Sequence, residues 1–101
     1  MPSYVLLSTL TPEGRKTVKD RPGRINEVNK EIEQYGAKVV TQYVVLGPYD
    51  FVTILEAPNN ETVARVSAVL GSRGTIQIMS MPAMSVDKFT EGIKGAGTKK
   101  G

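Results

Sequence analysis

The sequence contains neither cysteine nor histidine. Without cysteine, the chain can form no disulfide bond and has no thiolate to act as a nucleophile or metal ligand. Without histidine, it lacks the usual general base near neutral pH and the commonest metal ligand in proteins. A metal or haem site would need tyrosine, methionine or carboxylate ligands, so we expect no metal and no other cofactor.

Long apolar runs are absent as well. Every apolar stretch is far shorter than the about 20 residues that a helix needs to cross a bilayer. Residues 1–7 carry no lysine or arginine ahead of their apolar positions, which argues against a secretory signal peptide. We therefore expect a cytoplasmic protein without a membrane segment.

The excess of positive charge lies at the end of the chain. The formal net charge is +3, and Lys94, Lys99 and Lys100 account for it, because residues 1–93 hold equal numbers of acidic and basic side chains. Small and polar residues dominate 91–101, so we predict a folded domain at 1–90 and a disordered basic tail at 91–101. We favour a solubilising role for this tail over an arm for nucleic acid or an acidic partner.

Strand and helix patterns alternate along the rest of the chain. The predicted elements are a strand at 3–10, a short basic helix opened by Thr11 and Pro12, an amphipathic helix at 24–35, strands at 37–46 and 49–57, a helix through 63–70, a strand at 75–84 and a short last helix from 85. The turn Gly47-Pro48-Tyr49-Asp50 joins the two middle strands as a hairpin. This βαββαβ order predicts a ferredoxin-like α+β fold, with a four-stranded antiparallel sheet and both main helices on one face.

The strands carry apolar residues on both sides, although helices can cover only one face of such a sheet. Period-two counting does not say which side is covered, and a slip of one residue exchanges the faces. We assign Val5, Leu7, Val52, Ile54, Ile76 and Ile78 to the helix side, which leaves Tyr4, Leu6, Ser8, Phe51, Thr53, Leu55, Gln77, Met79 and Met81 on the other. Aromatic residues and methionine are enriched at protein interfaces. We therefore predict a homodimer, or a higher homo-oligomer, packed through the second face.

The run Leu46-Gly47-Pro48-Tyr49-Asp50-Phe51-Val52 resembles the Gly-Tyr-Asp signature of the GYD domain family, small bacterial and archaeal proteins of largely unassigned function. The resemblance covers roughly residues 2–90, and Pro48 interrupts the more compact Gly-Glu-Tyr-Asp form of the turn. It implies a dimeric α+β barrel, a superfamily that includes haem-degrading and cofactor-free monooxygenases, lactone isomerases and small-molecule-sensing regulators. Fold alone selects none of these activities.

Two sets of residues are candidates for a site. Asp50 could act as a general base and Tyr49 as a hydrogen-bond donor to a substrate, although we favour a structural role in which Asp50 accepts backbone N–H groups of the turn. A ligand pocket at the dimer face would be lined by Tyr4, Ser8, Phe51, Thr53, Gln77 and Met79. These neutral groups suit the orientation of a small organic molecule, or they satisfy one another across a dimer interface.

Basic residues gather at Arg15, Lys16, Lys19, Arg21 and Arg24. Such a patch could bind a phosphate, an acidic partner or RNA, but we favour a solvated helix face balanced by nearby glutamates. The strands lack an aromatic RNA-stacking motif, which argues against nucleic acid.

Three functions fit the sequence. The first is a small-molecule-binding or accessory protein with a pocket at the dimer face. The second is a cofactor-independent monooxygenase or isomerase that uses Asp50 and Tyr49, and the third is an oligomeric structural adaptor. A pocket with an unpaired Asp50 would favour the enzyme, a pocket of neutral groups the binding protein, and a filled interface the adaptor.

Overall fold

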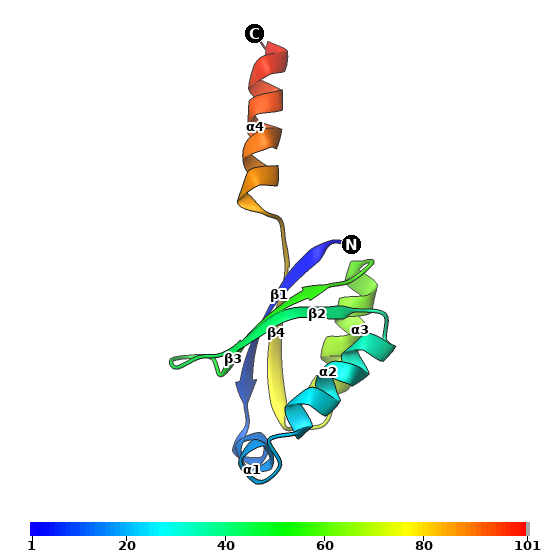
Figure 1. Cartoon of the computed structure of the whole chain (residues 1–101), viewed down its shortest axis with the longest axis vertical. Helices are drawn as coiled ribbons and strands as arrows, with labels where there is room; N and C mark the ends of the chain where they lie inside the picture. Colours follow the sequence, from blue (N-terminus) through cyan, green and yellow to red (C-terminus); the bar gives the residue numbers. More distant parts are fainter. Residues whose placement is uncertain (101) are drawn as a thin grey trace.

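In the computed structural model, the backbone is described for residues 1–100 and the side chains for residues 1–95. The elements are β1 (Ser3–Leu10), α1 (Pro12–Asp20), α2 (Arg24–Gln34), β2 (Lys38–Val44), β3 (Phe51–Glu56), α3 (Asn60–Gly71), β4 (Ile76–Ala83) and α4 (Val86–Lys100). The strands form one antiparallel sheet in the order β2-β3-β1-β4. This arrangement confirms the predicted ferredoxin-like α+β fold (Figure 1).

The helices α1 and α2 begin where the sequence predicts them, and α3 begins at Asn60, ahead of the predicted stretch 63–70. The Thr11 side chain caps α1 by accepting a hydrogen bond from the Gly14 N–H at 3.1 Å, and Pro12 occupies the first turn, where no N–H is needed. Asn59 caps α3 by accepting from the Thr62 N–H at 2.9 Å. These caps supply partners for N–H groups that a helix cannot satisfy itself.

The core lies between the sheet and the pair α2 and α3. Tyr4, Leu6 and Leu55 from the two central strands are buried against Ile32 of α2 and Val66 of α3. Leu55 of β3 and Val66 of α3 are fully buried, so the best-packed part of the domain is the cluster that joins the central strands to the helices. The many valines of α3 are poor helix formers, and this packing stabilises the helix in place of propensity.

The predicted faces of β1 and β3 are reversed in the structure. Tyr4, Leu6 and Ser8 of β1 are buried on the helix side, whereas Val5 and Leu7 are half-buried on the other. In β3 the helix side carries Phe51, Thr53 and Leu55, so the assignment of Val52 and Ile54 to that side was wrong as well. The assignment of Ile76 and Ile78 in β4 to the helix side is confirmed by their packing against the core.

The reversal has a clear origin in the strand sequences. Residues 4–7 are apolar on both faces, so alternation in β1 carries no information about which face the helices cover. The pairing register shows which face the helices cover. Residues directly opposite each other share a face, and Ser8 lies opposite Ile78 and Leu6 opposite Ser80.

The last helix is longer than the sequence indicates. α4 includes most of the segment 91–101 for which a disordered tail is predicted, while Gly101 lies outside the described residues. In Figure 1, α4 points away from the sheet and makes one end of a shape that measures 60 × 29 × 19 Å. The division into a domain at 1–90 and a tail at 91–101 stays a prediction.

Within the described residues, no helix has the length and apolar character of a membrane span.

The start of α1 is fixed against the turn that leads into β4. The Thr11 N–H donates to the Thr75 carbonyl at 3.0 Å, and the Thr11 hydroxyl donates to the Gly74 carbonyl at 2.9 Å. Gly14 is buried at this contact, where an added Cβ would lie 2.0 Å from the Thr75 carbonyl oxygen. Only glycine allows the two backbones to approach this closely.

We expect Gly14→Ala to lower the free energy of unfolding by about 1–3 kcal/mol, because the methyl group must push α1 away from Thr75. Urea unfolding followed by circular dichroism measures the change. Gly71→Ala is the matched control: nothing lies within 4 Å of its added Cβ. It should leave stability unchanged or raise it by about 0.5 kcal/mol. Equal effects of the two substitutions would contradict the close approach.

Candidate functional site

Asp50 connects the middle hairpin to the end of β1. Its carboxylate accepts a hydrogen bond from the Leu10 N–H at 2.7 Å and lies 3.9 Å from the Arg15 guanidinium. Its own N–H donates to the Ser8 carbonyl at 2.8 Å and so continues the β1–β3 pairing. Tyr49 is half-buried in the turn beside it. The carboxylate therefore holds two strand ends together. This is a structural role, as favoured from the sequence, but the N–H group that donates to Asp50 belongs to β1 and not to the turn.

The residues predicted to line one pocket lie on opposite sides of the sheet. Tyr4, Ser8, Phe51 and Thr53 are buried on the helix side, whereas Gln77 and Met79 are exposed on the other. The placement of the first four on the uncovered face was wrong, because β1 and β3 present the other set of side chains there. The six residues therefore do not come together around a single space.

The Tyr4 hydroxyl and the Thr53 hydroxyl of this set have hydrogen-bond partners on neighbouring elements. The Tyr4 hydroxyl donates to the Asn60 side chain at 2.6 Å. The Asn29 amide donates to the Gln42 carbonyl oxygen at 2.9 Å, and the Gln42 amide donates to the Thr53 hydroxyl at 3.0 Å. This chain of hydrogen bonds ties α2 to β2 and β3, and it explains why a threonine is tolerated in the core.

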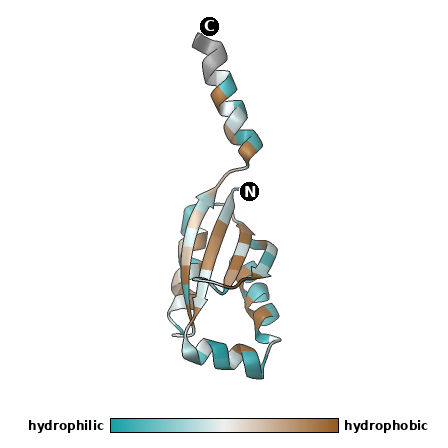
Figure 2. Cartoon of the chain, turned by 90° about the vertical axis from the view of Figure 1, so that its left-hand side faces the viewer, coloured by the Kyte–Doolittle hydropathy of each residue, from teal (hydrophilic) through white to brown (hydrophobic). Residues whose placement is uncertain are grey.

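The side of the sheet away from the helices is an apolar surface, which we call the open face. Its side chains are Val5, Leu7, Tyr43, Val52, Ile54, Met79 and Met81. Figure 2 views the sheet from this side and shows hydrophobic segments along neighbouring strands. Tyr43 is 60% exposed and Met79 51%. Neighbouring exposed apolar side chains of this kind are typical of interaction sites.

Two further groups of apolar side chains are exposed. One follows the edge strand β2 into the hairpin, where Val44 is 74% exposed and Leu46 is 100% exposed. The other forms a stripe along α4 through Val86, Phe89 and Ile93, at positions that share one side of a helix. Within the described residues, neither group is covered.

A cavity of about 150 Å³ lies on the helix side of the sheet, between α1, α2 and the end of α3. Its walls are mostly apolar and include Val18, Val28 and Phe51, while Arg24 and Arg73 also line it. The sequence gives no sign of this cavity, because it arises where the short helix α1 leaves the sheet and α2 only partly fills the space.

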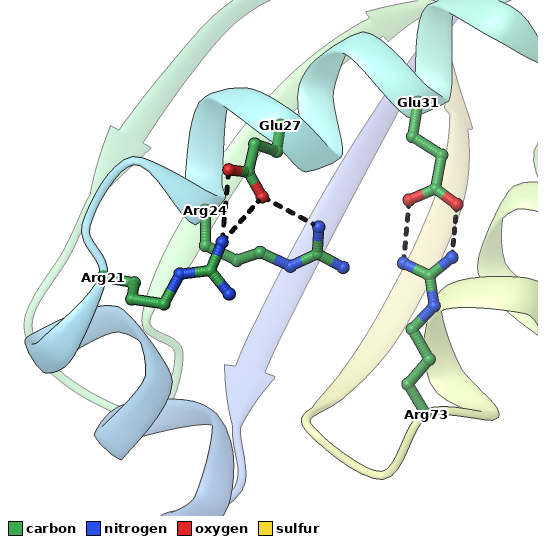
Figure 3. A network of polar contacts seen from close by, with 5 residues as sticks. All are labelled: Arg21, Arg24, Glu27, Glu31 and Arg73. Atoms are coloured by element: carbon green, nitrogen blue, oxygen red, sulfur yellow. Dashed lines mark hydrogen bonds and ion pairs between the residues drawn. The ribbon is translucent and has the colours of Figure 1, made fainter.

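Ion pairs cross the surface beside this cavity (Figure 3). Glu27 accepts hydrogen bonds from Arg21 at 3.3 Å and from Arg24 at 3.2 Å. Arg73, in the turn after α3, makes a bidentate pair with Glu31 of α2, whose longer contact is 2.8 Å. Three of the five basic residues singled out in the sequence, Arg15, Arg21 and Arg24, thus have carboxylate partners.

The Glu31–Arg73 pair perturbs both of its members. The hydrogen bond from Arg73 holds the pKa of the Glu31 carboxyl below its ordinary value, and the same bond raises the pKa of Arg73. The two residues are 42 positions apart, and no sequence pattern predicts the contact.

Among the residues that the structure describes, no group of three or more acidic side chains could hold a metal ion.

We expect Asp50→Ala to lower the free energy of unfolding by about 2 kcal/mol, because it removes a charged acceptor from the Leu10 N–H. Asp50→Asn keeps an acceptor oxygen and should cost about 1 kcal/mol or less. The midpoints of urea unfolding, at an unchanged slope, measure both effects. A fully stable Asp50→Ala variant would show that the carboxylate does not hold the strand ends together.

Stability should fall at acid pH partly through Glu31. Because its pKa is lowered in the folded state, its contribution is present above the unfolded value of about 4.3 and is lost as the pH falls through the lower folded value. We expect Glu31→Gln to lower stability at neutral pH by about 0.5–1 kcal/mol and to have no effect at about pH 2. Urea unfolding at both pH values measures this. An equal loss at both would rule out the ion pair as its cause.

The chain is similar to proteins of known sequence and structure. The GYD domain family matches residues 4–93. A protein of Thermus thermophilus, named glutamine synthetase and cystathionine beta-lyase binding protein, is 49% identical over 87 residues, which are 85% of this chain and 92% of that protein.

Two crystal structures share the fold. TTHA0845 from Thermus thermophilus matches with a TM-score of 0.53 at 20% identity, over 85% of this chain and 96% of that chain. The Leucine response regulatory protein (LrpA) of Mycobacterium tuberculosis matches with a TM-score of 0.57 at 15% identity, over 84% of this chain and 51% of that chain. Together with the Gly47-to-Asp50 turn and the ferredoxin-like sheet, the match over residues 4–93 establishes that this chain belongs to the GYD domain family.

Proposed function

We propose that this protein is an accessory module that binds metabolic enzymes, and that glutamine synthetase and cystathionine β-lyase are the first partners to test. The relative that is 49% identical over almost its whole length is named for binding these two enzymes. The cytoplasmic location expected from the sequence is part of this proposal.

The amount of exposed apolar surface is the observation that carries the proposal. The open face, the hairpin after β2 and the stripe on α4 all expose large apolar side chains. Exposed apolar residues are ordinary when they are scattered singly, but contiguous groups usually serve to bind another protein. A protein that joins others needs at least one surface of this kind.

The open face suits a second copy of the same chain. It is largely uncharged and made of β-branched residues, Leu7, Tyr43 and two methionines. Two identical faces can pack about a two-fold axis, so that the same surface of each chain forms the interface. A homodimer of this kind is the assembly expected from the sequence.

The hairpin suits a different partner. Val44 and Leu46 stand at the end of the edge strand β2, beyond the part of the sheet that a second copy would cover. An apolar edge strand exposed to solvent is a liability unless a partner covers it. We assign this edge to the partner enzyme.

Two substitutions separate self-association from enzyme binding. Leu7→Lys places a charge in the centre of the open face and should convert the dimer to a monomer. Leu46→Lys changes a side chain that is 100% exposed, so it should leave the dimer intact and weaken enzyme binding roughly tenfold. Light scattering after size exclusion reports the first effect, and interferometry with each purified enzyme of the same organism reports the second.

Ala64→Lys is the matched control, because it adds the same charge at an exposed position of α3. It should change neither the mass in solution nor the affinity for either enzyme. A wild-type protein that is monomeric at micromolar concentration would refute the dimer. If the protein binds neither enzyme, the accessory role is refuted.

A further inference from the structure

We propose that the cavity between α1, α2 and the helix side of the sheet binds a small molecule with a compact apolar body and one anionic head group. A short branched-chain or aryl carboxylate is the simplest compound of this class. The site lies on the opposite side of the sheet from the open face, so it does not rest on the proposed binding of enzymes.

The size and walls of the cavity define the apolar body. The volume is about 150 Å³, and Leu10, Val18, Ile25, Val28, Phe51 and Ile76 are among the side chains around it. An enclosed apolar cavity of roughly this volume in another protein takes up benzene. The space here is partly open to solvent, so it can admit a ring of that size and leave one end of a ligand at the rim. A six-membered ring or a branched chain of similar size therefore fits.

The polar side chains that line the cavity already have hydrogen-bond partners in the protein. Asn29 and Gln42 line the cavity, and they are already joined to each other and to Thr53 by hydrogen bonds. Within the described part of the chain, every fully buried side-chain nitrogen or oxygen has a partner. A buried water or a buried ligand hydroxyl would have little to bind, so the enclosed part of the ligand must be apolar.

The rim provides the contact for an anion. Arg24 and Arg73 both line the cavity, and their side chains are 34% and 33% exposed. Figure 3 shows the Arg24 guanidinium extending from α2 between Glu27 and the Glu31–Arg73 pair. The contact of Arg24 with Glu27 uses only Nη1, which leaves further N–H groups for a carboxylate.

The rim itself holds two guanidinium groups, on Arg24 and Arg73, beside two carboxylates, on Glu27 and Glu31. A third guanidinium, on Arg21, also pairs with Glu27 but does not line the cavity. Because Arg21 shares Glu27 with Arg24, the Arg24 guanidinium is not fully occupied and can bind a carboxylate from a ligand. Arginine is well suited to this contact because its planar group binds carboxylates with two parallel hydrogen bonds.

A ligand at this site would connect parts of the fold that are otherwise joined by few contacts. Among the described residues, the Glu31–Arg73 pair is the hydrogen-bonded link between α2 and the turn after α3. A molecule that fills the cavity would touch α1, α2 and the sheet together. Since it would bind only the folded protein, it should raise the melting temperature as its concentration rises above the Kd.

Titration of the isotope-labelled 101-residue chain with benzoate, followed by amide and methyl NMR shifts, tests the site directly. We expect saturable shifts at Val18, Ile25 and Val28 with a Kd of about 1 mM or tighter. Benzyl alcohol, a neutral compound with the same ring and a similar size, should bind roughly tenfold more weakly. The monomeric Leu7→Lys variant should bind benzoate as the wild type does, so failure of the dimer proposal leaves this test intact.

Three variants separate the rim from the cavity. Arg24→Gln should weaken benzoate roughly tenfold and leave benzyl alcohol unchanged. Val28→Phe fills the space and should abolish binding of both compounds, and Val18→Phe does the same from α1 in case the first variant does not fold. Arg65→Gln, an exposed arginine on α3 away from the cavity lining, is the control and should bind like the wild type.

The proposal is overturned if the wild-type protein gives no saturable shifts with benzoate, or if the shifts lie away from the cavity. It is equally overturned if a folded Val28→Phe or Val18→Phe variant binds both compounds as the wild type does. If Arg65→Gln weakens benzoate as much as Arg24→Gln, the attraction is a general effect of charge and the assigned rim is wrong.

Discussion

The packing of β1 beneath the helices α2 and α3 is the interaction on which the other features of the structure depend. β1 is paired on both sides, with β3 and with β4. Tyr4 and Leu6 are buried under the helices at 3% exposure each. Because successive side chains of a strand point to opposite faces, burial of these two residues forces Val5 and Leu7 onto the open face. The apolar surface available to a partner is thus a consequence of how the core is built.

The element order and the fold could be predicted from the sequence because each element carries its own local signal. Thr11-Pro12 opens a helix, Gly47-Pro48-Tyr49-Asp50 makes a turn, and Ile25, Val28 and Ile32 recur at helical spacing. The choice of face in β1 and β3 has no such signal, since both sides of residues 4–7 are apolar. Ser8 and Thr53 look like pocket residues in the sequence, but hydrogen bonding within the core makes burial of Thr53 possible.

The site depends on contacts between distant parts of the chain, which local patterns do not contain. Arg73 meets Glu31 across 42 positions, and Gly14 meets the backbone of Thr75 only because α1 is held against the turn before β4. The cavity is what remains between these contacts. Asp50 is the exception, because its place in a turn already indicated a structural carboxylate, and its bond to the Leu10 N–H agrees with that interpretation.

α4 extends from the sheet along the 60 Å axis of the molecule, with Phe89 and Ile93 exposed on one side. A partner that touches both this helix and the hairpin would be held at two points on one chain. Two such contacts act as a bivalent ligand, in which the first raises the effective concentration of the second. The avidity of a symmetric assembly would then depend on the distance between α4 and the hairpin as much as on the strength of either contact.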